Sequence, residues 1–310
     1  MEMDLTLAET VVDWVIKALP HDTSDAAVVT ALRNKHPGEL LALFFNWQGR
    51  LISSEPRKLM RSTQFDQNTV AAERSGAVLQ IIDAIEQGND LSRYLSRRVR
   101  SGFVLPDKPN KKNLRRLQHL DMLLNEWGIH HLHLSTNVEI DGFVERGGPL
   151  LFVMFRADRA YLLDIGTHET FEDDKLAQIA ISNWPNDQLF LEIKGIIGLS
   201  GGTSHTSEDR KKLRSAGISS FIQFGNRVFS PAGGISTAGT SVQASMRSNR
   251  IMRALEIFEE HVLADPSPII AFIRKHGGMP ADPPEFEFSL FQNGFGVIEK
   301  TSGVPIGLQG

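Results

Sequence analysis

The chain contains no cysteine among its 310 residues, which excludes disulfide bonds, thiolate metal sites and cysteine nucleophiles. It also lacks an apolar run long enough to cross a bilayer, and its first residues lead into an amphipathic pattern instead of a signal peptide. Hydrophobic residues make up 41% and charged residues 23%, as in ordinary globular proteins. These features predict a folded, cytoplasmic protein without membrane contact, long enough for two folding units.

The chain has slightly fewer basic than acidic residues, but its positive charge is concentrated in one stretch. The formal net charge of −4 by itself argues against nucleic acid as a partner. Between Arg93 and His119, however, nine lysines and arginines stand against one acid, Asp107. Such an excess forms either a solvated linker with a basic helix face or a patch that contacts phosphates, and both interpretations stay open.

The pattern of apolar residues indicates an α+β fold. Apolar residues recur at helical spacing in the first part of the chain, where a helix over 68–87 ends at Gly88. Residues 102–113 carry two prolines and three lysines, which favours a linker, and after Gly128 the period changes from helical to extended. The expected domains are an all-α helical domain over 1–101, a basic linker over 102–113, an α+β core over 114–200 and a C-terminal α/β extension over 201–310.

Local signals also divide the C-terminal extension. The expected elements are a short helix capped by Thr206, a hairpin that turns at Gly225–Asn226 and a long helix capped by Thr240 or Ser241. The tail from Pro280 is rich in proline, glycine and phenylalanine, and we expect it to pack as irregular structure.

Four of the ten histidines gather around the strands of the core. His130, His131 and His133 begin a strand in which alternate side chains share a face, so His131 and His133 point the same way. His168 follows closely after another expected strand, over 160–166. If these two strands lie near each other in one sheet, His133 and His168 face a common cleft.

The segment from about Asn113 to Phe171 resembles the RelE/ParE toxin superfamily, and most closely its YafQ-type members. "HLHLS" is similar to the first histidine strand of that family, "PLLFVMFRADRAYLLDIG" to its hairpin and "GTHETF" to its closing motif. Members are small ribosome-dependent endoribonucleases. The resemblance implies a RelE-like core with a helix and an antiparallel sheet, in which His133 and His168 are catalytic and Phe171 holds the substrate base. It also implies ribosome-bound RNA as the substrate, an inhibitory antitoxin or partner protein, and no cofactor.

Cleavage of RNA by its own 2′-hydroxyl needs a base, an acid for the leaving 5′-oxygen and a cation for the charged phosphorane. Histidine can serve as base or acid at neutral pH. The predicted catalytic residues are His131, His133 and His168, and the predicted substrate-binding residues are Arg115, Arg116, Arg146 and Phe171. The predicted function is an endoribonuclease of toxin or phage-defence type that uses no metal ion.

Two metal-dependent alternatives use other residues. The His-x-His strand with a distant histidine and Glu139 follows the ligand pattern of cupin barrels, although the second cupin motif is absent. Asp164, Glu192 and Lys194 resemble the acids and lysine of PD-(D/E)xK nucleases, in which the acids bind Mg²⁺. "GGISTAGTS", residues 233–241, has the glycine spacing of a P-loop without its lysine, which favours a shaped loop over a nucleotide site.

A non-enzymatic alternative keeps the same fold as an RNA- or protein-binding module whose histidines are structural. The mutual geometry of the side chains discriminates between the two hypotheses. Catalysis requires His133 and His168 to approach one cleft beside at least one arginine.

Overall fold

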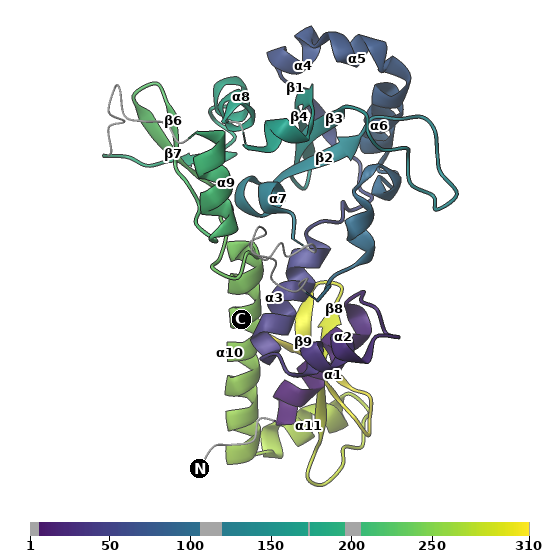
Figure 1. Ribbon diagram of the computed structural model, residues 1–310. Coiled ribbons are helices and arrows are strands. Elements are labelled where there is room, and N and C mark those ends of the chain that lie inside the picture. Colours follow the sequence, from purple (N-terminus) through teal and green to yellow (C-terminus); the bar gives the residue numbers. More distant parts are fainter. Residues whose placement is uncertain (1–5, 106–119, 173, 196–205, 310) are drawn as a thin grey trace. The chain divides into compact units, whose positions relative to one another are not determined.

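The computed structural model describes residues 6–105, 120–172, 174–195 and 206–309 (Figure 1). Contacts between residues divide the chain into two compact units, each built from separate segments. Unit 1 comprises Met1–Phe45, Ser101–Leu105 and Ala244–Gly310, and unit 2 comprises Asn46–Arg100 and Pro106–Gln243. The contacts therefore group the chain differently from the boundaries expected at 101, 113 and 200, because both the N-terminal segment and the C-terminal extension are shared between the units.

Unit 1 combines helices from both ends of the chain with a C-terminal sheet. Its helices are α1 (Thr6–Ala18), α2 (Ala26–Arg33), α3 (Pro37–Gln48), α10 (Val242–Ala264) and α11 (Ser267–Lys275). The last residues of α3 and the first residues of α10 are grouped with unit 2. Its strands are β8 (Phe286–Phe291), β9 (Gly294–Glu299) and β10 (Pro305–Leu308), in the antiparallel order β10-β9-β8. Trp14 of α1 meets Phe288 of β8 edge-on, with ring centroids 5.4 Å apart. The first helix and the C-terminal sheet therefore share one core.

The expectation of an irregular tail after Pro280 is wrong, because most of this segment forms the sheet of unit 1. Phe286, Phe288 and Leu290 recur with the period of two that is typical of a strand, and Asn293-Gly294 is a hairpin signal. The proline and glycine content of the segment obscured this alternation.

Unit 2 is built on a four-stranded sheet in the order β1-β4-β3-β2. Its strands are β1 (Lys58–Arg61), β2 (Ile129–His133), β3 (Leu150–Phe155) and β4 (Arg159–Gly166). Strands β2, β3 and β4 are antiparallel neighbours, whereas β1 pairs in parallel with β4. The fold is therefore α+β as predicted, but β1 corrects the expectation that the N-terminal segment is all-α.

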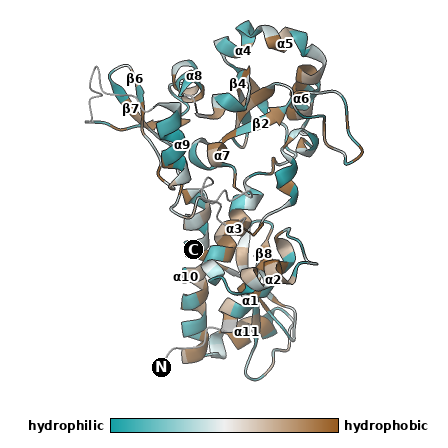
Figure 2. Ribbon diagram, in the orientation of Figure 1, coloured by the Kyte–Doolittle hydropathy of each residue, from teal (hydrophilic) through white to brown (hydrophobic). Residues whose placement is uncertain are grey.

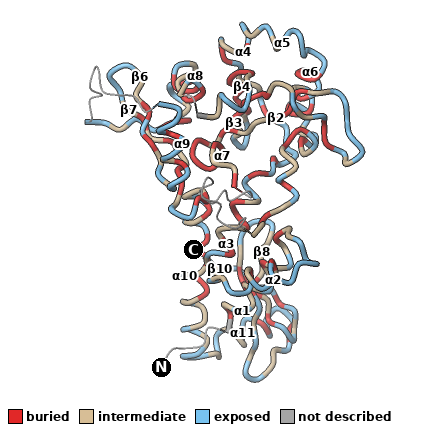
Figure 3. Tube along the Cα trace, in the orientation of Figure 1, coloured by how far each residue is buried: buried red, intermediate tan, exposed pale blue. Residues whose placement is uncertain are grey.

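Both faces of this sheet are covered, which explains why β4 is hydrophobic along much of its length (Figure 2) and why β3 and β4 are buried (Figure 3). The helices of unit 2 are α4 (Thr63–Gln67), α5 (Thr69–Glu73), α6 (Ser75–Gln87), α7 (Met122–Trp127), α8 (Lys175–Asn183) and α9 (Ser207–Ser215), with the 3₁₀ helices η1 (Ser92–Tyr94), η2 (Arg97–Arg100) and η3 (His168–Glu172). Leu151 and Val153 of β3 face the core that contains α6, and Phe152 and Met154 face the core that contains α7 and α8.

A second, smaller sheet in unit 2 has the order β5-β7-β6. Its strands are β5 (Phe190–Glu192), β6 (Ile222–Phe224) and β7 (Arg227–Pro231). The hairpin of β6 and β7 is confirmed, and Gly225 in its turn has a φ of 62°, which glycine adopts readily. The capping of α9 by Thr206 is also confirmed. Among the described residues, no helix has the length and apolar character needed to span a membrane.

Candidate functional site

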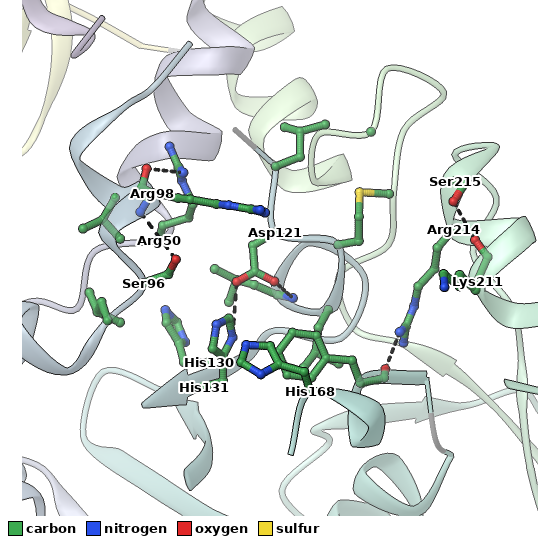
Figure 4. A pocket seen from close by; sticks show the side chains of 18 of the residues that line it. Arg50, Ser96, Arg98, Asp121, His130, His131, His168, Lys211, Arg214 and Ser215 are labelled. Atoms are coloured by element: carbon green, nitrogen blue, oxygen red, sulfur yellow. Dashed lines mark hydrogen bonds and ion pairs between the residues drawn. The ribbon is translucent and has the colours of Figure 1, made fainter. Parts of the chain in front are cut away.

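A cavity of about 700 Å³ lies in unit 2 (Figure 4). Side chains from β2, η2, α7, η3 and α9 line it, together with the loop that precedes α10. The cavity therefore collects residues from segments that are far apart in the sequence.

His131, His133 and His168 converge in this cavity. Their ring centroids are 6.1 Å apart for His131 and His133, 6.1 Å for His131 and His168, and 6.2 Å for His133 and His168. The register of the sheet explains this arrangement. His133 pairs with Leu150 of β3, and Leu150 pairs with Gly166 at the end of β4, shortly before His168 in the chain. The strand pairing thus brings the three imidazoles into one cleft.

The ring of Phe171 completes this histidine cluster. Its centroid lies 4.8 Å from that of His131 and 5.1 Å from that of His168. On its other side, Phe171 meets the buried ring of Phe152 edge-on at 5.8 Å. An aromatic face therefore lies beside the imidazoles, where a flat ligand could stack.

Burial keeps two of the imidazoles neutral at pH 7. Burial first, and then repulsion from the neighbouring His131 and Arg146, lowers the pKa of His133 to about 4. Burial and the charge of His131 also lower the pKa of His168. A neutral imidazole has a free nitrogen that can accept a proton or a hydrogen bond.

Asp121 lies opposite His131 and was missed by the sequence reasoning. Its Oδ1 accepts a hydrogen bond from the Leu124 N–H at 3.1 Å and so caps α7. Its Oδ2 lies 3.5 Å from Nδ1 of His131, where a carboxylate can orient the ring and stabilise an imidazolium. The segment from 114 to 127 has the pattern of one continuous helix, so the capping position of Asp121 was not visible in the sequence.

Arg146 supplies a cation beside the histidines. Its Nε and Nη2 atoms are buried and have no hydrogen-bond partner among the described residues. Burial lowers its pKa from the usual arginine value. The other two predicted cations, Arg115 and Arg116, lie outside the described residues.

Other arginines of the basic stretch have partners from the loop that follows β2. Arg97 forms ion pairs with Glu139 and Asp141, and Arg100 donates to the carbonyl oxygen of Asp141. Arg98, by contrast, lines the cavity and forms no ion pair within the described part of the chain. The basic stretch is thus partly neutralised by acids that lie much later in the sequence.

His130 contributes a fourth imidazole from the opposite face of β2. It meets Phe155 edge-on at 5.3 Å and also lines a second cavity of about 480 Å³. Burial lowers its pKa to about 4.

A buried ion pair supports η3, and no local pattern of residues predicts it. Glu126 of α7 is fully buried and accepts hydrogen bonds from Arg214 of α9 and, at 2.9 Å, from the Ser220 N–H. Arg214 also donates to the carbonyl oxygen of Phe171 and lies 4.3 Å from the ring centroid of Trp127. Because a buried charge is costly unless paired and hydrogen-bonded, these contacts fix α7, α9 and η3 relative to one another.

The residues of the metal-dependent alternatives do not form a metal centre. Within the described ranges, no three histidine, aspartate or glutamate side chains are placed to hold a metal ion. Asp164 on β4 pairs with Lys175, while Glu192 on β5 pairs with Arg227. Because β4 and β5 belong to different sheets, and each acid already has its own cation, the structure does not bring Asp164, Glu192 and Lys194 into one cluster.

The glycine-rich segment before α10 is a shaped loop that forms part of the cavity wall. The carbonyl oxygen of Gly239 accepts a hydrogen bond from the Asn125 side chain at 2.8 Å, and the Ser236 N–H donates to the carbonyl oxygen of Thr240 at 2.8 Å. Thr237, Ala238 and Gly239 line the cavity.

Comparison of the chain with protein-family models, with curated proteins and with solved structures found no match. The resemblance to the RelE/ParE superfamily therefore depends on the quoted motifs alone. The class of site that the geometry defines is a cationic cavity with clustered imidazoles.

Proposed function

We propose that this protein is an endoribonuclease of toxin or phage-defence type, which cleaves RNA by histidine acid and base catalysis. The observation that carries the proposal is the convergence of three imidazoles beside the guanidinium of Arg146 in one cavity. Base, acid and cation are the three groups that cleavage by the 2′-hydroxyl requires.

The environments of the histidines suggest a role for each in this reaction. His133, which is neutral at pH 7, removes the proton of the 2′-hydroxyl, and the 2′-oxygen then attacks the phosphorus. His131, beside the Asp121 carboxylate, donates a proton to the 5′-oxygen as the bond from phosphorus to that oxygen breaks. The products are a 2′,3′-cyclic phosphate and a 5′-hydroxyl. Arg146 neutralises the phosphorane, and His168 hydrogen-bonds one of its oxygens.

The substrate base stacks on Phe171 in this proposal, since its ring lies beside two of the three imidazoles. The need for a 2′-hydroxyl restricts cleavage to RNA. The proposal also includes RNA that is bound to the ribosome and an antitoxin that restrains the enzyme, and both depend on the resemblance alone. The proposed cytoplasmic location depends on the composition alone.

The first experiment measures cleavage of an end-labelled RNA oligonucleotide by the purified wild type and by His133→Ala and His168→Ala variants with native circular dichroism. We expect each substitution to lower the cleavage rate by about 100-fold or more, because a general base such as His133 contributes about 10²–10⁴ and a hydrogen bond to the charged phosphorane, as from His168, contributes about 10²–10³. The RNA product should carry a cyclic phosphate, the same sequence as DNA should stay intact, and EDTA should have no effect. Cleavage at the wild-type rate in both variants would rule out the proposed chemistry.

A non-catalytic RNA-binding module is the second candidate. His133 is only 5% exposed, and such deep burial favours a structural role for its imidazole. The same experiment separates the two. RNA that binds to the wild type but stays intact, on the ribosome and in isolation, would support the module.

A further inference from the structure

The cavity carries positive charge on two sides of the histidine cluster. In Figure 4, Arg98 and Arg50 lie on one side of the histidines, and Lys211 lies on the other. Arg98 comes from η2 and Lys211 from α9, so both belong to segments outside the motifs that suggested a ribonuclease. These cations are additional to Arg146.

The acids of the cavity do not neutralise the two flanking cations. Within the described residues, the neighbours Arg97 and Lys212 form ion pairs, whereas neither Arg98 nor Lys211 does. Among the residues that the structure describes, the acids that line the cavity are Asp121 and Glu169. Asp121 is engaged with the Leu124 N–H and with His131, and Glu169 forms no ion pair with Arg98 or Lys211. The charge of Arg214 is matched by Glu126. An anion that fills only the histidine cluster would therefore leave positive charge uncompensated on both sides.

A nucleic acid strand carries regularly spaced phosphates on a flexible backbone, and it can therefore place a negative charge at the histidines and at the cations on both sides of them. A cavity of about 700 Å³ lies within the range of about 300–1,000 Å³ that is usual for small ligands, and a paired duplex is far too large to enter it. A single strand with unpaired bases can enter, and it can stack a base on Phe171.

We propose that the cavity binds a single RNA strand across three consecutive phosphates, with the central phosphate at the histidine cluster, one neighbour at Arg98 and the other at Lys211. This inference rests on the proposed function in that the central phosphate is the scissile one. It adds two binding subsites and a minimum substrate length, since a dinucleotide has one phosphate and a tetranucleotide has three.

The experiment measures binding without cleavage. Fluorescently labelled oligonucleotides with 2′-O-methyl groups cannot be cleaved by their own 2′-oxygen, and fluorescence anisotropy gives their Kd at a series of salt concentrations. The protein variants are Arg98→Ala, Lys211→Ala and the control Lys212→Ala. Lys212 lies on the same helix as Lys211 but pairs with Glu208 and does not line the cavity.

We expect the tetranucleotide to bind the wild type more tightly than the dinucleotide. For the tetranucleotide, Arg98→Ala and Lys211→Ala should each make the slope of log K against log salt less steep by about 0.7, the value for one phosphate contact with a single strand. The dinucleotide should bind these variants as it binds the wild type, and Lys212→Ala should match the wild type with both lengths.

Two results would overturn the inference: equal binding of the two lengths to the wild type, or salt slopes of both cavity variants equal to that of Lys212→Ala. Neither result depends on catalysis, because the probes cannot be cleaved. If the oligonucleotides bind as expected but natural RNA stays intact, the two binding subsites are supported and the proposed ribonuclease activity is contradicted.

Discussion

His130 and His133 are buried imidazoles that make the stability of this protein depend on pH. The pKa of each is lowered to about 4, compared with about 6.5 for a histidine in an unfolded chain. Between these two values the unfolded chain binds more protons than the native protein, so the free energy of unfolding decreases as the pH falls. The stabilisation is fully present at pH values above the pKa of histidine in the unfolded chain, and it is lost as the pH falls towards the native pKa of about 4.

We predict a loss of about 2 kcal/mol in the free energy of unfolding for each of these two histidines between about pH 7.5 and about pH 5. Chemical denaturation at a series of pH values measures the loss. His130→Gln should remove about half of this pH dependence, since glutamine does not titrate. His261→Gln, which replaces an exposed histidine of α10, is the matched control. A pH profile of His130→Gln that parallels the wild type would contradict the prediction.

The histidine cluster could be predicted from the sequence, whereas its surroundings could not. Strand alternation places His131 and His133 on one face, and antiparallel pairing of neighbouring strands brings His168 to them. Asp121 and Lys211 reach the same cavity through packing between distant segments. No local pattern of residues encodes such packing.

At the level of elements, the C-terminal sheet contains a pair of glycines in very different surroundings. Gly296 of β9 and Gly307 of β10 are register partners. A Cβ added at Gly296 would collide with the carbonyl oxygen of Ile306, which is backbone and cannot swing away. A Cβ added at Gly307 would meet no atom within 4 Å, and neither glycine has a positive φ.

We predict that Gly296→Ala lowers the free energy of unfolding by about 1–3 kcal/mol, the usual cost of overpacking, because β9 and β10 must move apart. Gly307→Ala should change it by less than about 0.5 kcal/mol, as is usual for a surface substitution without a clash. Urea denaturation of the two variants beside the wild type measures both values. Equal stability of the two variants would show that β9 and β10 do not pair in this register.

Elements with local signals were predictable, and elements fixed by distant pairing were not. The β6–β7 hairpin and the cap of α9 follow from turn and capping residues within a few positions. Strand β1 has no alternating pattern in its sequence, KLMR, and it exists because it pairs in parallel with β4. The expected helix over 68–87 is divided into α5 and α6 at Arg74, directly before Ser75-Gly76, a dipeptide that also occurs inside helical patterns and so is a weak sign of a break.

At the level of the whole molecule, the division into units depends on contacts between the two ends of the chain. The Phe288 N–H donates to the Thr10 hydroxyl at 2.9 Å, which joins β8 to α1 across nearly the whole sequence. Proline- and lysine-rich segments mark loops but do not reveal which segments pack together. For this reason the boundaries expected from the sequence followed composition, whereas the contacts follow the two cores.

Separate cores predict separate losses of protection when one core is damaged. Phe288 in unit 1 is 2% exposed and Phe65 in unit 2 is 1% exposed, so truncation of either to alanine should destabilise its own unit by about 3–5 kcal/mol. Hydrogen exchange followed by mass spectrometry can locate the effect along the chain. We expect Phe288→Ala to accelerate exchange in α1 and β8–β10 and to leave β3 and β4 protected, and Phe65→Ala to do the reverse. Equal acceleration throughout the chain in both variants would mean that the two units unfold as one, in which case damage to the core of unit 1 would also abolish the site that β2 and η3 build in unit 2.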